Sequence, residues 1–309
     1  MELSVVITTK NRFNDLIACI DSIKNAEINV EWELIIIDDN SKDETKKIRA
    51  DKLRIKNCKV YHSNVNLMLV KARNIGAAQS TGNFVLFIDD DNIIDRKMIS
   101  ILCDSMKDIK NDTYGILGPV MYYFDTRLKA LDYQRIDLLT GRTISVNLDQ
   151  YSICESDGVP NVLLMVRKKI FDNVGYFDEK LIQTYTEPDM SFQAMKKGYL
   201  TGVVQNAKTY HKISKNGKFN SRKFGGVHLQ KAYCLMRNRA VIVKRYGNDT
   251  QIFFYRYLFS NLWLIIYLLI GLKNMDMKAV RNYYMGYRDG MKYIKTDILS
   301  NSLLRIDSK

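Results

Sequence analysis

The stretch Phe84-Val85-Leu86-Phe87-Ile88-Asp89-Asp90-Asp91 passes directly from apolar residues to three carboxylates. A short apolar run rich in Val, Ile and Phe is typical of a buried strand. Side chains alternate along a strand, so Asp89 and Asp91 can face one cavity together. Two carboxylates on one side stay ionised at low cost only with a cation between them, and oxygen ligands favour Mg²⁺ or Mn²⁺. The stretch therefore predicts a strand that ends in a divalent-metal site; a solvated acidic turn is the alternative.

Strands and helices alternate on both sides of this stretch. Strands are predicted at 3–9, 33–37 and 59–62, and helices at 14–25, from 43 onwards and at 69–80. This alternation predicts an α/β fold with a mainly parallel, Rossmann-like sheet and helices on both faces. Ligands of such sheets bind beyond the carboxyl ends of the strands. The polar groups that follow the first two strands, Thr8-Thr9 and Asp38-Asp39, should therefore share one site with the acidic stretch.

The rest of the chain predicts a second half of the same domain and then a helical extension. Strand-like runs occupy 115–123 and 162–166, and a helix should follow Pro188. We expect one domain over 1–228, in two halves at 1–110 and 111–228. A loop rich in Gly, Lys, Ser and Asn at 211–228 should form a mobile lid over a bound ligand. Residues 229–309 are the predicted helical, membrane-associating region, which begins with an amphipathic basic helix at 229–246.

Charge is concentrated near the C-terminus. Residues 1–206 carry 27 Lys and Arg against 29 Asp and Glu, whereas residues 207–309 carry 20 against 5. Nucleic acid and anionic membranes are the usual partners of such a surface, and a solvated basic face is the alternative. The five cysteines are odd in number and widely spaced, which argues against a disulfide framework or a cysteine zinc site.

An apolar, aromatic segment lies inside this basic region. Residues 252–272 include an uncharged run from 257 to 272, just shorter than the ~17–25 residues that span a bilayer. Basic residues flank it on both sides, which favours a helix lying in the membrane interface over a spanning helix or a helix packed on the catalytic domain. A nucleic-acid partner is not expected, because binding to nucleic acid would not explain this uncharged apolar run. We expect peripheral or monotopic attachment to the cytoplasmic face of a membrane.

Four motifs, in order and over about 90 residues, resemble those of the family 2 glycosyltransferases. They are Val5-Val6-Ile7-Thr8-Thr9-Lys10-Asn11-Arg12, Ile36-Ile37-Asp38-Asp39-Asn40-Ser41, Asn66 with Lys71-Ala72-Arg73-Asn74-Ile75-Gly76, and Phe87-Ile88-Asp89-Asp90-Asp91. The resemblance implies the GT-A fold and transfer with inversion at the anomeric carbon. It makes 1–228 the catalytic domain, with a nucleotide-binding half at 1–110 and an acceptor-binding half at 111–228, and the lid would close over the sugar donor. It extends more loosely to about residue 240.

The resemblance also implies roles for single residues. Asp39 looks like the aspartate that hydrogen-bonds the nucleotide base, and Asp89 and Asp91 match the family's metal-binding pair, with Asp91 the more direct ligand. The other donor-binding residues implied in this way are Thr9, Asp38, Asn66, Arg73 and Asp90. His211, in Tyr210-His211-Lys212, resembles a late family histidine that can ligate the metal. A structural histidine is the alternative.

The catalytic base is expected in Thr186-Glu187-Pro188-Asp189. This segment resembles the acidic motif before the family's acceptor-site helix, and Glu187 stands where the base is usually an aspartate. An inverting transfer needs one base to take the acceptor proton, and a helix N-terminus stabilises the ionised carboxylate. Glu187 and Asp189 are therefore the catalytic candidates; helix capping by both is the alternative. Arg237-Asn238-Arg239 also resembles a family element, to which the sequence assigns no function.

The predicted enzyme is a metal-dependent inverting glycosyltransferase. Its donor is a UDP-sugar, or alternatively a dTDP- or GDP-sugar, and its acceptor is a lipid-linked or glycan hydroxyl. A sugar nucleotidyltransferase is a second hypothesis, although no glycine precedes Gly76 to form a phosphate loop after the first strand. A non-catalytic basic binding protein is the third, and it leaves Asp89, Asp91 and Glu187 unexplained.

Overall fold

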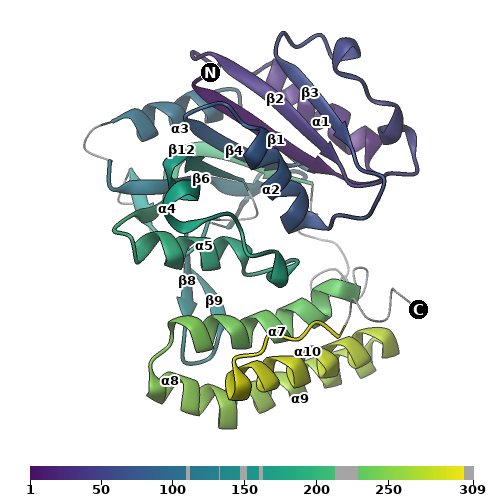
Figure 1. Ribbon diagram of the computed structural model, residues 1–309, viewed down its shortest axis with the longest axis vertical. Coiled ribbons are helices and arrows are strands. Elements are labelled where there is room, and N and C mark those ends of the chain that lie inside the picture. Colours follow the sequence, from purple (N-terminus) through teal and green to yellow (C-terminus); the bar gives the residue numbers. More distant parts are fainter. Residues whose placement is uncertain (109–111, 132, 147–151, 160–162, 213–228, 303–309) are drawn as a thin grey trace. The chain divides into compact units, whose positions relative to one another are not determined.

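The computed structural model describes residues 1–108, 112–131, 133–146, 152–159, 163–212 and 229–302. It divides into two compact units (Figure 1). The first comprises 1–135, 145–177 and 190–215, and the second comprises 136–144, 178–189 and 216–309. The predicted lid lies almost entirely at 213–228, outside the described residues. The predicted domain boundaries stay a prediction.

The first unit is built on one ten-stranded sheet. Its main order is β10-β12-β6-β11-β4-β1-β2-β3, with β5 paired to β12 and β7 to β6. The bounds are β1 (Leu3–Thr9), β2 (Trp32–Asp38), β3 (Cys58–His62), β4 (Phe84–Asp89), β5 (Asn92–Ile94), β6 (Tyr114–Tyr123), β7 (Lys129–Leu131), β10 (Ile153–Glu155), β11 (Leu164–Arg167) and β12 (Leu200–His211).

The strands of the N-terminal half run parallel, as the sequence predicts. β1 pairs in parallel with both β2 and β4, and β2 with β3. The later strands make the sheet a mixed one, because β11 runs antiparallel between β4 and β6. Among the described strands, β12 and β6 form the one further parallel pair.

Helices cover both faces of this sheet (Figure 1). Residues of β1 alternate between the two cores: Val5 and Ile7 pack into one, and Val6 into the other. The first core also receives α1 (Phe13–Lys24) and α3 (Met98–Lys107). The second receives α2 (Leu69–Gln79), α4 (Lys169–Val174) and the C-terminal part of α5 (Thr186–Met195). The predicted two-faced arrangement is confirmed.

One predicted helix is wrong. Instead of a helix from residue 43, the chain makes two 3₁₀ turns, η1 (Glu44–Lys47) and η2 (Ala50–Lys52). Between them Ile48 is extended, with φ −65° and ψ 134°, and its carbonyl contacts Nε2 of His62 at 2.9 Å. The buried Ile48 and this tertiary contact prevail over the helical charge pattern.

The second unit is mainly helical. Its long helices are α7 (Leu229–Tyr246), which has the predicted bounds, and α10 (Met277–Thr296). Between them lies a continuous helical run of α8 (Asp249–Phe254), the π-helical η6 (Tyr255–Phe259) and α9 (Ser260–Lys273). The unit also holds the short η5 (Glu179–Leu181), the start of α5, and the tip of the hairpin formed by β8 (Tyr133–Asp137) and β9 (Arg142–Val146).

Within the described residues, the run Asp249–Lys273 is the one helix long and apolar enough to cross a membrane by length and composition. Such a feature alone is weak support for a span. Only 11% of its most apolar window is buried.

Candidate functional site

Three parallel strands bring the predicted polar groups to one edge of the sheet. In the register of β1 with its neighbours, Thr9 lies opposite Asp38 and Thr8 opposite Asp89. The backbone N–H of Asp39 donates to the Thr9 carbonyl at 2.9 Å. Three runs separated by some 30 to 50 residues in sequence therefore end side by side.

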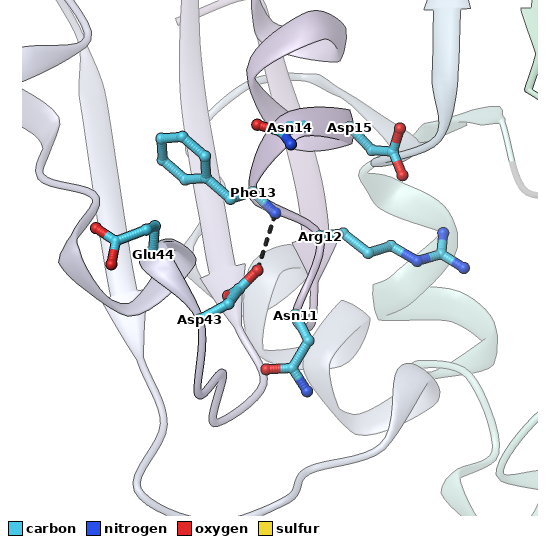
Figure 2. A pocket seen from close by; sticks show the side chains of 7 residues that line it. All are labelled: Asn11, Arg12, Phe13, Asn14, Asp15, Asp43 and Glu44. Carbon is cyan, nitrogen blue, oxygen red and sulfur yellow. Dashed lines mark hydrogen bonds between the residues drawn. The ribbon is translucent and has the colours of Figure 1, made fainter.

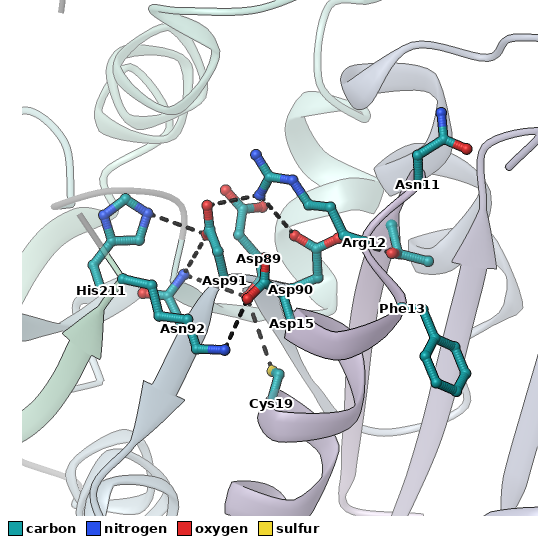
Figure 3. Close-up of polar contacts among 12 residues, drawn as sticks. Asn11, Arg12, Phe13, Asp15, Cys19, Asp89, Asp90, Asp91, Asn92 and His211 are labelled. Carbon is teal, nitrogen blue, oxygen red and sulfur yellow. Dashed lines mark hydrogen bonds and ion pairs between the residues drawn. The ribbon is translucent and has the colours of Figure 1, made fainter. Parts of the chain in front are cut away.

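The three aspartates after β4 have different partners (Figure 3). Asp89 accepts from Nη2 of the buried Arg73 at 3.0 Å. Asp90 is buried and accepts from Thr9 Oγ1 at 2.7 Å and from Arg12 at 3.0 Å. Asp91 is contacted on one oxygen by Arg12 at 2.7 Å and on the other by Nε2 of His211 at 3.1 Å.

These surroundings shift the carboxyl pKa values in opposite directions. Burial raises the pKa of Asp90 to about 6, although Arg12 and Thr9 oppose the shift. Burial would raise the pKa of Asp91 as well, but the bonds to His211 and Arg12 outweigh it and hold that pKa well below its usual range. Asp91 is thus an ionised carboxylate with a cation beside it.

The side chains around Asp91 fit the predicted metal site in part. β5 pairs with the end of β12, which places His211 opposite Asn92 and so against Asp91. An imidazole nitrogen with carboxylate oxygens suits Mn²⁺ better than Mg²⁺. Among the described residues, however, no three His, Cys, Asp or Glu side chains are grouped tightly enough to hold an ion. Asp89 contacts Arg73 instead, so a complete set of metal ligands would need Asp89 to turn or a bound ligand to supply further oxygens.

A second group of contacts forms around Asp39. One of its oxygens accepts from the backbone N–H of Leu67, and the other lies 3.4 Å from Lys10 Nζ. The same ammonium donates to Asn66 Oδ1 at 2.7 Å. The predicted donor-binding residues Asp39 and Asn66 are therefore joined through Lys10.

Asp38 lies beside Asp39 but has a different environment. It is 2% exposed, accepts from the backbone N–H of Ser41, and contacts Nδ1 of His62 at 2.8 Å. Because both ring nitrogens of His62 face acceptors, the imidazolium form fits best. Partial burial opposes protonation, but the bond to Asp38 outweighs it and raises the pKa of His62. These contacts hold β2 to β3.

Two basic residues of the site were missed from the sequence. Arg12 bridges Asp90 and Asp91, and Lys10 bridges Asp39 and Asn66. Both belong to the first motif, Thr8-Thr9-Lys10-Asn11-Arg12. Their position directly after β1 could have indicated this role. The loop after β1 lies next to the acids at the ends of the neighbouring strands β2 and β4.

An open cavity of about 430 Å³ lies beside Arg12 (Figure 2). It is lined by the start of α1 and by Asp43 and Glu44, and Asp43 accepts from the backbone N–H of Phe13 at 3.2 Å. These carboxylates make its wall acidic, which disfavours a diphosphate. We assign no ligand to it.

The predicted catalytic acids lie in the second unit, in the first turn of α5. Asp189 is 1% exposed, and its Oδ1 accepts from Arg245 at 2.9 Å and from the Tyr246 hydroxyl at 2.8 Å. Glu187 is 9% exposed. The helix begins at Thr186, so Pro188 lies within the first turn and not at the first position. The N–H groups of the first turn have no partner within the helix, so a proline is tolerated there.

Comparisons with known proteins identify the family of the chain. The family model for glycosyl transferase family 2 matches residues 4–175, more than half of the chain. The chain belongs to this family. It is a glycosyltransferase with the GT-A fold, which sets aside the nucleotidyltransferase and binding-protein hypotheses.

The names of some curated relatives include a lipid-linked or polymeric substrate. The GalNAc(5)-diNAcBac-PP-undecaprenol beta-1,3-glucosyltransferase of Campylobacter jejuni is 38% identical over 97 residues, covering 29% of this chain and 30% of that protein. The dTDP-rhamnosyl transferase RfbF of Shigella flexneri is 24% identical over 258 residues, 78% of this chain and 79% of that protein. Several other curated relatives are much longer, and the chain spans 17% to 18% of their length.

Solved structures support the fold. The structure of residues 1–349 of TarS from Staphylococcus aureus has a TM-score of 0.57 at 17% identity and covers 96% of this chain and 92% of that one. That of GalNAc-T7 with UDP, GalNAc and Mn²⁺ has a TM-score of 0.67 at 17% identity and covers 98% and 58%.

Proposed function

We propose that this glycosyltransferase moves a sugar from a nucleotide-diphosphate-sugar to a hydroxyl of a lipid-linked or growing glycan, with inversion and with Mn²⁺ or Mg²⁺. The observation that carries the proposal is that Asp39 follows β2 while Asp89 and Asp91 lie at the end of β4, the two strands that flank β1 in parallel. One acid group can recognise the base, and the other can hold the cation that neutralises the diphosphate. In this proposal 1–228 is the catalytic region and 229–309 the membrane-associating region.

The donor side uses the groups around the two acidic motifs. Asp39, fixed by Lys10 and the Leu67 N–H, accepts from the nucleotide base, with Thr9 and Asn66 beside it. Asp91 and His211, with Asp89, would hold the metal, which would stabilise charge on the leaving diphosphate. Arg73 can add a positive charge near the same phosphates.

The acceptor side needs one general base, and we assign that role to Glu187, which stands where the base of the family is usually an aspartate. Oδ1 of Asp189 accepts from both Arg245 and Tyr246, which ties this second acid to α7. A base of this kind contributes about 10²–10⁴-fold to rate. Glu187 would take the acceptor proton as the hydroxyl attacks the anomeric carbon and the nucleoside diphosphate leaves.

The proposed nucleotide and acceptor classes rest on the chemistry of the site and on the names of relatives. UDP is the first choice, with dTDP suggested by the name of the Shigella relative and GDP as a third option. An undecaprenol-linked glycan named for the Campylobacter relative supports a lipid-linked acceptor. Incubating the protein with each radiolabelled nucleotide-sugar and Mn²⁺, with and without lipid-linked oligosaccharides, tests the proposal. No transfer and no donor hydrolysis with any donor would refute it.

We further infer that the enzyme works on the cytoplasmic face of a membrane, with the α8–η6–α9 run lying flat in the anionic interface. Exposed apolar side chains follow one another along one face of this run at spacings of three and four residues. They are Leu258, Leu262, Ile265, Leu269 and Leu272, preceded by Phe253, Phe254 and Tyr257. Fully burying side chains of this size gains about 1.5–3 kcal/mol each.

The opposite face of the run is packed within the second unit. Trp263 Nε1 donates to the Thr140 carbonyl at 2.8 Å, and the Tyr267 ring stacks on Tyr283 of α10 at 5.0 Å. Further along, α10 carries exposed bases such as Arg281, Arg288 and Lys292, so it cannot follow α9 into hydrocarbon. This packing disfavours a span, and the exposed Lys273 and Lys278 can meet lipid phosphates.

Depth measurements distinguish a flat helix from a span. Positions 258 and 272 are about 21 Å apart along a helix, at 1.5 Å per residue. Single cysteines placed there in a Cys58→Ser background and labelled with a fluorophore should be quenched at equal depth by brominated phosphatidylglycerol vesicles. Depths that differ by about 20 Å would indicate a span, and binding to no vesicle would refute attachment without affecting the donor assay.

A further inference from the structure

The segment 178–185, which leads into α5 and Glu187, is held in an unusual conformation. Ile182, Thr184 and Tyr185 have φ values of 65°, 61° and 59°, in the left-handed region that side-chain-bearing residues rarely adopt. Ile182 is β-branched, for which this conformation is least favourable. Such a backbone persists only where surrounding contacts determine it.

Those contacts come from three consecutive residues of α7. The buried Asn238 amide nitrogen lies within hydrogen-bonding distance of the carbonyls of Leu181 at 2.8 Å, Gln183 at 2.7 Å and Thr184 at 3.0 Å. Arg237 donates from Nη2 to the Lys180 carbonyl at 2.5 Å. Every carbonyl from 180 to 184 except that of Ile182 therefore faces one of these two side chains.

The orientation of the Asn238 amide is itself fixed. Nε of Arg237 donates to Asn238 Oδ1 at 2.9 Å, so the amide nitrogen must be the atom that faces the segment. The neighbouring Arg239 donates to the Tyr185 hydroxyl at 3.3 Å, and that hydroxyl donates to the Gly141 carbonyl at 2.8 Å.

The last turn of α7 also contacts the start of this segment and the first turn of α5 that follows it. Arg245 contacts Asp178 at 2.6 Å with Nη2 and Asp189 at 2.9 Å with Nη1. The single guanidinium thus joins the residue before η5 to the first turn of α5. Glu187 lies between these anchors.

We propose that Asn238, oriented by Arg237, is a positioning residue that fixes the backbone of 181–184 and so the placement of the Glu187 carboxylate, with the Arg245–Asp189 pair closing the other end. This inference rests on the proposed role of Glu187 as base. It assigns a function to the Arg237-Asn238-Arg239 element and gives Asp189 a structural role distinct from that of Glu187. A misplacement of about 1 Å at a reacting group can reduce the rate about hundredfold.

The test is a double-mutant cycle between Asn238→Ala and Glu187→Gln. Asn238→Ala should lower kcat about 10- to 100-fold with the donor KM within about twofold of the parent, and it should shift the acidic limb of the kcat pH profile. In the Glu187→Gln background the same change should have little further effect, because Asn238 acts through that carboxylate. Equal losses in both backgrounds, or a kcat loss matched by the loss of folded protein, would overturn the proposal.

Two further variants complete the design. Asn261→Ala removes a hydrogen bond of the same unit, from the Tyr287 hydroxyl at 2.7 Å, and should leave kcat on a soluble acceptor unchanged. If Asn238→Ala does not fold, Arg237→Lys keeps the buried charge but loses the Nε donor and should show the same pattern in the cycle. Normal turnover by Glu187→Gln alone would refute the proposed base, which is a separate outcome from additive effects at Asn238.

Discussion

The two units differ in where their charged and apolar side chains lie. The first unit buries its apolar residues in two cores and gathers carboxylates at one sheet edge, where Lys10, Arg12 and Arg73 meet them. The second unit buries arginines such as Arg237 against backbone carbonyls and leaves a row of apolar side chains exposed. The first pattern suits a water-soluble anionic donor with a cation. The second suits a unit that fixes one catalytic segment and rests on lipid.

The largest effect is expected at Asp91. Asp91→Ala should abolish transfer and Mn²⁺-dependent nucleotide binding, because it removes the carboxylate that Arg12 and His211 hold in its ionised form. Initial rates and isothermal titration with UDP and Mn²⁺ measure both effects, with the exposed Asp51→Asn as the control. Undiminished activity in excess EDTA would exclude the metal role altogether.

Substitutions of the two acids of α5 should have different effects, one on turnover and the other on stability. Glu187→Gln should lower kcat about 10²–10⁴-fold while leaving donor binding and stability near those of the parent. Asp189→Asn should instead lower the free energy of unfolding by about 1.5–3 kcal/mol, because it weakens charged hydrogen bonds to Arg245 and Tyr246. Kinetics and urea denaturation separate the two; the reverse assignment of effects would show that Asp189 is the base.

The sequence predicted the first unit better than the second for a physical reason. Each apolar run of β1, β2 and β4 passes directly into polar residues, so local pattern alone places the strand ends together. The contact of Arg12 with Asp91, 79 residues apart, was harder to predict: the position of Arg12 directly after β1 places it near the strand-end acids but does not decide which acid it contacts.

The contacts of the second unit depend still more on tertiary structure. The bounds of α7 follow from helical periodicity, but Asn238 reaches carbonyls of residues 54 to 57 positions earlier, and no local pattern encodes such a contact. Likewise, the run around α9 is apolar on all sides, so only the structure distinguishes its packed face from its exposed one.

A pH test addresses the stability of the first unit alone. Burial would raise the pKa of Glu33, but hydrogen bonds from Lys59, Thr81 and Ser4 outweigh it and lower that pKa to about 2. The carboxylate therefore stabilises the fold above its unfolded pKa, near 4.5, and this contribution is lost as the pH falls from about 4.5 to about 2. Glu33→Gln should lower the free energy of unfolding by about 3 kcal/mol at pH 7 and by almost nothing near pH 2.

Hydrogen exchange at pH 7 locates this loss. Protection should fall in β1 and β2 of the Glu33→Gln variant and stay unchanged in α7 and α10, with the exposed Glu31→Gln as control. Equal loss of protection in all four elements would mean that the two units unfold as one.

The smallest effect is expected at Arg12. Its guanidinium contacts an oxygen of Asp91 that a metal would use, so Arg12→Ala should strengthen Mn²⁺ binding in the absence of nucleotide by about fivefold, the equivalent of about 1 kcal/mol for a partly exposed pair. Mn²⁺ titration followed by electron paramagnetic resonance measures this, with Arg49→Ala as control. Weaker Mn²⁺ binding by the variant would show that Arg12 supports the metal site instead of competing with it.

Thermal unfolding with UDP, dTDP and GDP, each with and without Mn²⁺, tests the central claim most directly. If the acids at the ends of β2 and β4 form one nucleotide-metal site, one nucleotide at about 100 times its Kd should stabilise the protein by about 2.7 kcal/mol in the presence of Mn²⁺. The same nucleotide should stabilise far less in EDTA, and Asp91→Ala should remove the difference. Stabilisation that is equal with Mn²⁺ and with EDTA, or absent with every nucleotide, would contradict the account.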